Sequence, residues 1–409
     1  MKTQLFSGLV ESLEIPSVIF LLLFAEVLNI SASVVNVVNF ISYGIVALLV
    51  IRRWKQVTYV ATRDISLMLL VGVALTSIFW SDNLGDTISN LRGLIRSTIF
   101  GAYLATRYSP KEQMRLLSWT IGIAIILSIA VSLALPSYGT HHINHTIAWQ
   151  GIYAHKQYLG RIMALGASVF LVTAFDKQSN HWVALTGLCL VCTLILASKS
   201  STGLIIFVFS ILLMPLYKIL KQPNKLRVVL LIIALLLFMS LAIVILMNLE
   251  TIVVDLLGKD LEFNGRTPIW NLAIEMGLEQ PWLGYGYAAF WDSDAGKYII
   301  DNTWAFQADT SRGFHSHNGF LQLFLELGFI GLLLFIINFL LVFKRVFFLF
   351  VSTKKNVFFW MFEFLVIKIV FNMSEQITIL SPSNIYWIIY VSIALSSIVE
   401  YNKIRQNSI

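Results

Sequence analysis

The sequence predicts an all-α protein that crosses a membrane many times. Hydrophobic residues fill 57% of the 409 positions and charged residues only 12%, about half the charged share of a typical soluble domain. The apolar residues form continuous runs rather than alternating with polar ones, which favours helices over a barrel. This composition excludes a soluble enzyme, a disordered tail and a nucleic-acid-binding protein, so the net charge of +7 is best explained by membrane topology.

Apolar runs close to the length of about 20 residues that crosses roughly 30 Å of hydrocarbon define about 12 predicted transmembrane helices. They lie near residues 15–31, 33–51, 65–80, 87–106, 114–135, 150–175, 182–197, 201–217, 227–249, 318–343, 357–374 and 384–400. The chain is therefore expected to consist of helices one to nine in residues 1–249, a large polar loop in 250–317, and helices ten to twelve in 318–409. The first run is followed by no small-residue cleavage site, so we expect it to be retained.

The basic residues predict the orientation. Most of the 29 lysines and arginines fall in loops and tails on the side that carries both termini. Because basic residues concentrate on the cytoplasmic side of membrane proteins, we expect both termini in the cytoplasm. The loop 250–317, between helices nine and ten, is then extracytoplasmic.

This large loop is acidic and rich in aromatic residues. Its stretch TPIWNLAIEMGLEQPW has apolar residues at helical spacing between Pro268 and Pro281, which predicts a helix at the membrane interface or over the bundle. The aromatic residues have two interpretations: they anchor the loop at the interface, or they form a wall on which sugars stack.

Five basic residues fall inside the predicted spans. Each costs on the order of 2.5–3.5 kcal/mol near mid-membrane, so each needs a compensating partner or ligand. These residues are Arg92, Arg96, Lys156, Arg161 and Lys368. In the predicted orientation, the first three lie in the outer half of the bundle.

Two interpretations of these charges are open. In one, Arg92 or Arg96 pairs with Asp82 or Asp86, and Arg161 binds a helix-end carbonyl. In the other, the outer-half basic residues bind the phosphate or pyrophosphate of a lipid, which requires clustered Arg and Lys side chains. The candidate binding residues of the second interpretation are Arg92, Arg96, His155, Lys156, Lys199, Arg266, Arg312, His315 and His317, and Asn318 is a further candidate for substrate binding.

The strongest local motif is FHSHNGFLQLFLELGFIGLLLF, residues 314–335. Asn318 or Ser316 is a predicted N-cap of the tenth helix. His317 then lies at a helix N-terminus, where a bound anion is favoured. Beside Arg266 and Arg312, its imidazole is a candidate proton acceptor.

The spacing within this motif resembles the signature of the bacterial O-antigen ligase and O-antigen polymerase superfamily, which includes exopolysaccharide polymerases. His317 and Asn318 are followed by nine residues, Gly328, two residues and Gly331, and the two glycines are expected to permit close helix packing. The segments NGRTPIWNLA, PWLGYGYAAF and GIYAHKQYLG are also similar. The last is closest to the exopolysaccharide-polymerase pattern, with Gln157 where Asn is usual.

The resemblance implies a membrane glycosyltransferase on the periplasmic face of the bacterial inner membrane. It would transfer a glycan from an undecaprenyl-pyrophosphate carrier to a sugar hydroxyl, with no metal, nucleotide or other cofactor. His317 would activate the acceptor hydroxyl and Arg266 would hold the pyrophosphate. Lys199, in the segment SKSSTG where relatives often carry Arg, would be a second residue that binds the pyrophosphate. We expect a single displacement that inverts the sugar configuration, as in inverting hydrolases.

Three functions are compatible with these sequence features. Polymerisation of polysaccharide repeat units is favoured by the HKQ segment, and ligation of O-antigen to lipid A core is the alternative. A transporter or flippase of lipid-linked glycan is more distant, because such proteins usually contain two related halves and this sequence shows none. The expected partners are the lipid-linked oligosaccharide, a glycan or lipid A-core acceptor, membrane lipid and polysaccharide-assembly proteins, without nucleic acid.

Metal ligands are sparse in the sequence. His141, His142 and His145 form the motif HHINH, but no carboxylate lies near them in sequence. Two cysteines in the whole chain do not provide a Cys-based metal site. No metal centre is predicted.

Overall fold

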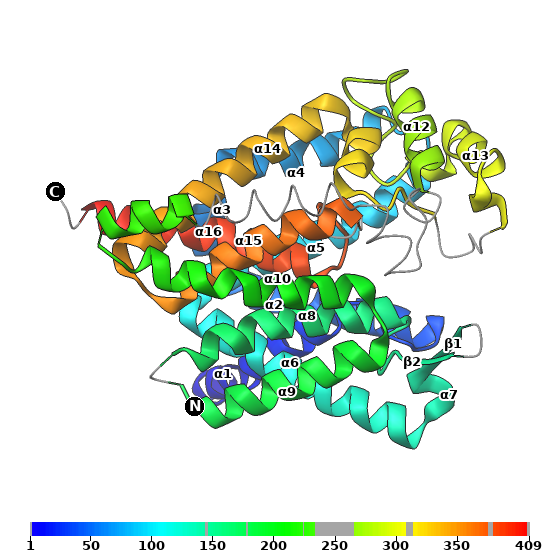
Figure 1. Ribbon diagram of the computed structural model, residues 1–409. Coiled ribbons are helices and arrows are strands. Elements are labelled where there is room, and N and C mark those ends of the chain that lie inside the picture. The colour runs from blue at the N-terminus through cyan, green and yellow to red at the C-terminus, as the bar shows by residue number, and fades with distance from the viewer. Residues whose placement is uncertain are drawn as a thin grey trace.

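In the computed structural model, long helices run back and forth along a common direction (Figure 1). The structure describes residues 2–143, 146–176, 179–223, 225–233, 266–307, 314–374 and 379–406. The ends marked N and C lie at one end of the bundle, and α12, α13 and the hairpin β1–β2 lie at the other. The all-α, polytopic membrane class is confirmed.

The described elements follow one another along the chain. They are α1 (Lys2–Leu23), α2 (Ala32–Ile51), α3 (Trp54–Ala61), α4 (Ile65–Thr76), η1 (Ser77–Phe79), α5 (Leu84–Arg107), α6 (Pro110–Ala134), α7 (Pro136–Gly139), β1 (Thr140–Ile143), β2 (Thr146–Trp149), α8 (Lys156–Ala174), α9 (His181–Ser198), α10 (Ser201–Leu220), α12 (Arg266–Gly277), η3 (Phe290–Asp292), α13 (Asp294–Asp301), η4 (Trp304–Gln307), α14 (Gly319–Thr353), α15 (Asn356–Ser374) and α16 (Ile385–Gln406).

Eight helices of the described chain are long and apolar enough to cross a membrane: α2, α6, α8, α9, α10, α14, α15 and α16. A ninth span results if α3 and the helical stretch Ile65–Phe79, bent by 98°, count as one. The predicted span 87–106 corresponds to α5, which carries Arg92 and Arg96. Most of the predicted span 227–249 lies outside the described residues, so the total of twelve stays a prediction.

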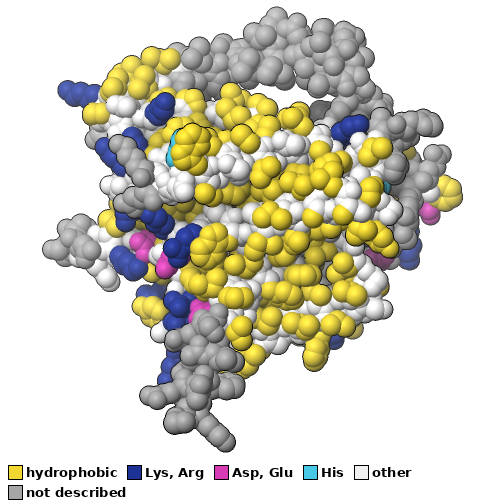
Figure 2. Space-filling model, turned by 90° about the horizontal axis from the view of Figure 1, so that it is seen from below, with side chains coloured by type: hydrophobic (Ala, Val, Ile, Leu, Met, Phe, Trp, Pro, Cys, Tyr) yellow, Lys and Arg dark blue, Asp and Glu magenta, His cyan; other side chains and the backbone are white. Residues whose placement is uncertain are grey.

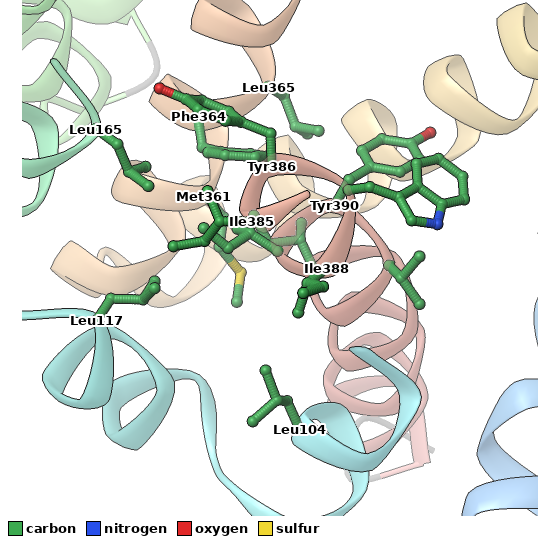
Figure 3. Packing of buried hydrophobic residues seen from close by; sticks show 14 of the residues in the cluster. Leu104, Leu117, Leu165, Met361, Phe364, Leu365, Ile385, Tyr386, Ile388 and Tyr390 are labelled. Carbon is green, nitrogen blue, oxygen red and sulfur yellow. The ribbon is translucent and has the colours of Figure 1, made fainter. Parts of the chain in front are cut away.

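The most buried helices are α8, α15 and α16, and they form the centre of the bundle. Apolar side chains of α5 and α6 meet them, as Leu104, Leu117, Leu165, Phe364 and Tyr386 illustrate (Figure 3). The outward faces of the surrounding helices are apolar as well, and charged side chains gather at one edge of the face that Figure 2 shows. This arrangement suits a protein whose sides contact lipid and whose ends contact water.

The described part of the large loop, residues 266–307, has a small hydrophobic core of its own. Helix α12 occupies the stretch where a helix was expected and packs against α14. Tyr285, Phe290 and Trp291 are buried between these elements, whereas Trp282 is 67% exposed and Phe306 72% exposed. Many of the loop's aromatic residues therefore pack against each other, and only a few are available to a membrane surface or a sugar.

A kink in α14 is filled by the backbone of the PWLGYG segment, residues 281–286. Gly328 interrupts the helix with φ 62° and ψ −164°. Backbone groups of α14 near the kink form hydrogen bonds with the loop instead. The Phe329 amide donates to the Pro281 carbonyl at 2.7 Å, and the Leu325 carbonyl accepts from the Tyr285 amide at 2.9 Å. Gly328 was expected to serve helix packing; instead it allows the loop backbone to enter the helix.

The segment around HHINH forms a short antiparallel hairpin between α7 and α8. Thr140 in β1 lies opposite Trp149 in β2. The sequence predicts only a connection between helices here, and the two strands are a difference that the structure shows. His145 lies outside the described residues.

Candidate active site

The tenth predicted span begins with a tightly held turn, residues 314–318. Asn318 is the N-cap of α14, and its side chain accepts from the amides of Phe320 and Leu321 at 3.0 and 3.1 Å. The Ser316 carbonyl accepts from the Trp270 indole of α12 at 2.7 Å. The turn is therefore fixed both to its own helix and to the large loop, and the Asn318 cap prediction is confirmed.

His317 lies in this turn with a left-handed backbone, φ 53°. Such a conformation is uncommon for a residue other than Gly, Asn or Asp and costs about 1–3 kcal/mol, and it concentrates at functional sites. The His317 amide donates to the Nδ1 atom of His315 at 3.3 Å, and the two ring centroids are 4.0 Å apart. The strained turn thus places two imidazoles together at the N-terminus of α14.

Both imidazoles are held in the neutral form. Burial, with the positive charges of Arg161 and Arg266, lowers the pKa of His315 to about 4. Burial, His315 and Arg266 lower the pKa of His317 to about 2. Because Arg266 acts on both rings, the structure brings together three of the residues predicted from sequence: Arg266 at the start of α12, His315 and His317.

Arg161 of α8 is a fourth member of this group. In one of the two interpretations of the sequence it binds a helix-end carbonyl, but its guanidinium lies 3.5 Å from the carboxylate of Glu26, and the two side chains are 2% and 3% exposed. Glu26 also accepts from Asn384, at 3.3 Å. The pair compensates a charge that is otherwise costly in the bundle, and the guanidinium still acts electrostatically on His315.

The N-terminal turn of α8 continues the group on the other side of Arg161. The Arg161 guanidinium lies 4.4 Å from the ring centroid of Tyr158. His155 caps α8 by accepting from the Gln157 amide, and its ring lies 4.9 Å from that of His141. Lys156 begins the helix. These basic residues therefore share one helix end with Arg161.

Lys199 is brought to the same helix by close backbone packing. It ends α9 in a left-handed conformation, φ 50°, and its side chain is exposed. A Cβ atom added to Gly160 would lie 2.3 Å from the Cβ of Ser200, so the turn that holds Lys199 packs directly against the residue preceding Arg161. The absence of a side chain at Gly160 permits this approach.

Arg92 and Arg96 have other surroundings. The Arg96 guanidinium donates to the Asn39 side chain at 3.0 Å and to the Ser383 hydroxyl, so its proposed pairing with Asp82 or Asp86 is wrong. Arg92 is exposed and forms no ion pair within the described chain. The described contacts do not join either arginine to His317, and Arg312 lies outside the described residues; the assignment of these three to substrate binding stays a prediction.

Several buried polar atoms near this group have no hydrogen-bond partner among the described residues. They include Nδ1 of His317, Nε of Arg161 and Oδ1 of Asn372. Asn372 belongs to α15 and faces the first residue of α14, because a Cβ atom on Gly319 would lie 2.1 Å from its Oδ1. Buried polar atoms without partners are costly, and a polar ligand that enters between α8, α14 and α15 would supply the missing contacts.

Comparison with known proteins now bears on this geometry. Residues 185–336, from α9 to the kinked half of α14, match the family described as O-antigen ligase. Over this part the chain is similar to the O-antigen ligase family. The matched part contains Lys199, Arg266, His315 and His317, whereas Arg161 lies outside it.

One relative of this O-antigen ligase-like chain is the exopolysaccharide production protein ExoQ of Rhizobium meliloti (strain 1021). The two are 28% identical over 221 residues, which cover 52% of this chain and 49% of the relative. The chain thus spans about half the length of the curated relative that it matches. The resemblance inferred from the histidine motif is confirmed at the level of the family.

Proposed function

We propose that the protein is a glycosyltransferase that moves a glycan from undecaprenyl pyrophosphate to a sugar hydroxyl. The observation that supports this most directly is the meeting of His315 and His317 with Arg161 and Arg266 at the N-terminus of α14. Cationic groups and a helix N-terminus stabilise a dianionic leaving group. A neutral imidazole beside them accepts a proton.

In this mechanism the acceptor hydroxyl oxygen attacks the anomeric carbon of the carrier-bound sugar. The bond from that carbon to the pyrophosphate oxygen breaks, and its electron pair leaves with the pyrophosphate, whose charge Arg266 and Lys199 stabilise. The hydroxyl proton passes to His317. Because attack and departure occur on opposite faces, the configuration inverts.

The carboxylates of this region support a single displacement. Glu26 is engaged by Arg161 and Asn384, and Glu326 accepts from Gln322 at 2.7 Å. Neither is positioned as a nucleophile that would form a covalent glycosyl intermediate. Side-chain cations occupy the role that a divalent ion plays in other transferases, so we propose a reaction without metal or other cofactor.

Polymerisation of repeat units is our preferred reaction. The name of the ExoQ relative refers to exopolysaccharide production, and the HKQ segment of α8, which resembles that branch, leads into Arg161. Ligation to lipid A core is the second candidate, supported by the description of the matched family. We further propose the bacterial inner membrane as the location, with both termini cytoplasmic and the site facing the periplasm.

The test is reconstitution of the purified chain in liposomes with a radiolabelled undecaprenyl-pyrophosphate oligosaccharide. Products longer than one repeat unit, with inverted anomeric linkages by NMR, support polymerisation. Transfer only when a lipid A-core acceptor is added favours ligation. Movement of the labelled lipid between leaflets without a new glycosidic bond would show a transporter and overturn the proposal.

The depressed histidine pKa values predict an unusual pH dependence. The base must be neutral, and the folded-state pKa values of about 2 for His317 and about 4 for His315 lie below the ordinary value of about 6.5. The imidazoles therefore stay neutral as the pH falls through 6.5. We expect kcat/KM, which reports the free enzyme, to change by less than about twofold between pH 7.5 and 5.5. A tenfold loss centred near pH 6.5 would contradict this prediction.

A further inference from the structure

A large cavity of the described chain lies far from His315 and His317, at the opposite end of the bundle. Its volume is about 970 Å³, and it is a lateral groove between α6 and α9 with α8 as its floor. Helices α1 and α9 mark the same side of the bundle, the lowest in Figure 1, which Figure 2 views from below. The groove therefore opens toward the lipid rather than toward the candidate active site.

The lining of the groove changes along its length. The part deeper in the bundle is apolar, with Ile123, Ile126 and Leu190. The part near the helix ends is polar and basic. There Lys111 and Arg115 follow each other by one turn of α6, opposite Asn180 at the start of α9. A ligand with an apolar body and a polar, anionic end matches this gradient.

The charges around the mouth favour an anion. Two cations and one carboxylate line the groove: Lys111, Arg115 and Glu112. The Glu112 carboxylate accepts from both the amide and the hydroxyl of Ser109 at 2.8 Å within the capping box of α6, and the positive charge of Arg115 also acts on it. Lys111 lies 3.8 Å from Asp176, and Arg115 lies 5.3 Å from the ring centroid of Trp119. The charged side chains that line the groove therefore carry a net positive charge, to which the exposed Arg115 guanidinium contributes.

The length of the groove fits one leaflet. Lys111 and Ile126 are separated by about 22 Å along a helix that rises 1.5 Å per residue. The hydrocarbon of one leaflet is about 15 Å thick and a headgroup adds several ångströms. Trp182 lines the groove near its polar end and Trp119 lies about midway along it; they are 78% and 44% exposed, and exposed Trp side chains are typical of a membrane interface.

From these observations we propose that the groove between α6 and α9 is a binding site for an anionic glycerophospholipid of the leaflet on the side of the termini. The acyl chains lie along Ile123, Ile126 and Leu190, and the phosphate is bound by Arg115 and Lys111. Basic pockets between transmembrane helices bind anionic headgroups in this way. The site is separate from glycan transfer and does not depend on the function proposed above.

Gly122 provides a sharp test of occupancy. It lines the groove, and a Cβ atom added to it would meet nothing within 4 Å. Gly122→Leu therefore fills the groove without disturbing the packing of α6. Gly72→Leu is the matched control, because a Cβ at Gly72 also meets nothing within 4 Å and Gly72 does not line the groove.

The full-length protein, delipidated in detergent, would be titrated with dioleoyl phosphatidylglycerol or phosphatidylcholine and examined by native mass spectrometry. We expect wild type and Gly72→Leu to retain one phosphatidylglycerol, and Gly122→Leu to retain none. The double variant Lys111→Gln/Arg115→Gln should bind it about 30-fold more weakly. Equal retention of phosphatidylcholine, binding unchanged by Gly122→Leu, or displacement of the phospholipid by a polyprenyl phosphate would overturn the proposal.

Discussion

Replacing His317 by alanine is expected to lower glycan transfer by about 10²–10⁴-fold. The reason is loss of the proton acceptor, whose contribution to a displacement is typically of this size. The neighbouring His315 does not replace it, because its Nδ1 atom already accepts from the His317 amide, which leaves the proton of the neutral ring on its other nitrogen. The measurement is the initial rate of oligosaccharide transfer in liposomes at equal protein amount.

A second variant separates chemistry from folding. His317 is left-handed, and alanine adopts that conformation less readily than asparagine. His317→Asn therefore keeps the turn while removing the base, and we expect the same loss of transfer with normal thermal stability. Full activity of His317→Asn would remove the imidazole from the mechanism.

Arg266 provides the matching test of leaving-group binding within the same prediction. Arg266→Ala should reduce transfer as severely, and Arg266→Lys should restore it only in part because the planar fork is lost. Lys297, an exposed basic residue of the same loop, is the control: Lys297→Ala should behave as wild type. Equal effects at Arg266 and Lys297 would indicate a general charge effect rather than a site.

Replacing Gly328 by alanine is expected to destabilise the fold by about 2–4 kcal/mol. A Cβ atom there would lie 2.2 Å from the carbonyl carbon of Trp282, and φ 62° with ψ −164° is a conformation that only glycine adopts readily. The contact is to backbone, so no side-chain rotation relieves it. We expect a lower temperature of unfolding in detergent and faster proteolysis of residues 281–286.

The control for this substitution is Gly72→Ala in α4. No atom lies within 4 Å of a Cβ at Gly72, and alanine has the higher helix propensity, so the protein should gain about 0.5–1 kcal/mol or remain unchanged. Comparable destabilisation by both substitutions would mean that the loop does not depend on the kink.

Much of the helical architecture could be predicted from the sequence, because the signals that mark helices are local. Apolar runs of bilayer length marked the spans, and Asn318 before an apolar run marked the start of α14. The candidate site was accessible for a related reason: Arg266, His315 and His317 lie in one loop segment with recognisable spacing. Such signals need no knowledge of tertiary packing.

The pairings between distant segments were not accessible in this way. Glu26 and Arg161 are separated by 135 residues. By charge alone, each could have paired with several other residues. The insertion of residues 281–286 at the kink of α14 could not be predicted, because the apolar sequence pattern continues across Gly328 without a break. The signals that existed were indirect: a buried acid without an obvious partner, and a glycine-rich turn with no assigned role.

The kink at Gly328 also bears on the order in which the molecule is completed during synthesis. Segment 281–286 leaves the ribosome before the helix whose broken hydrogen bonds it satisfies, so its backbone acquires those partners only after residues 325–330 have emerged. His317 lies near the start of the same helix, in a turn held by the Asn318 cap and by Trp270. The kink and the packing of segment 281–286 against it are thus completed together, late in synthesis.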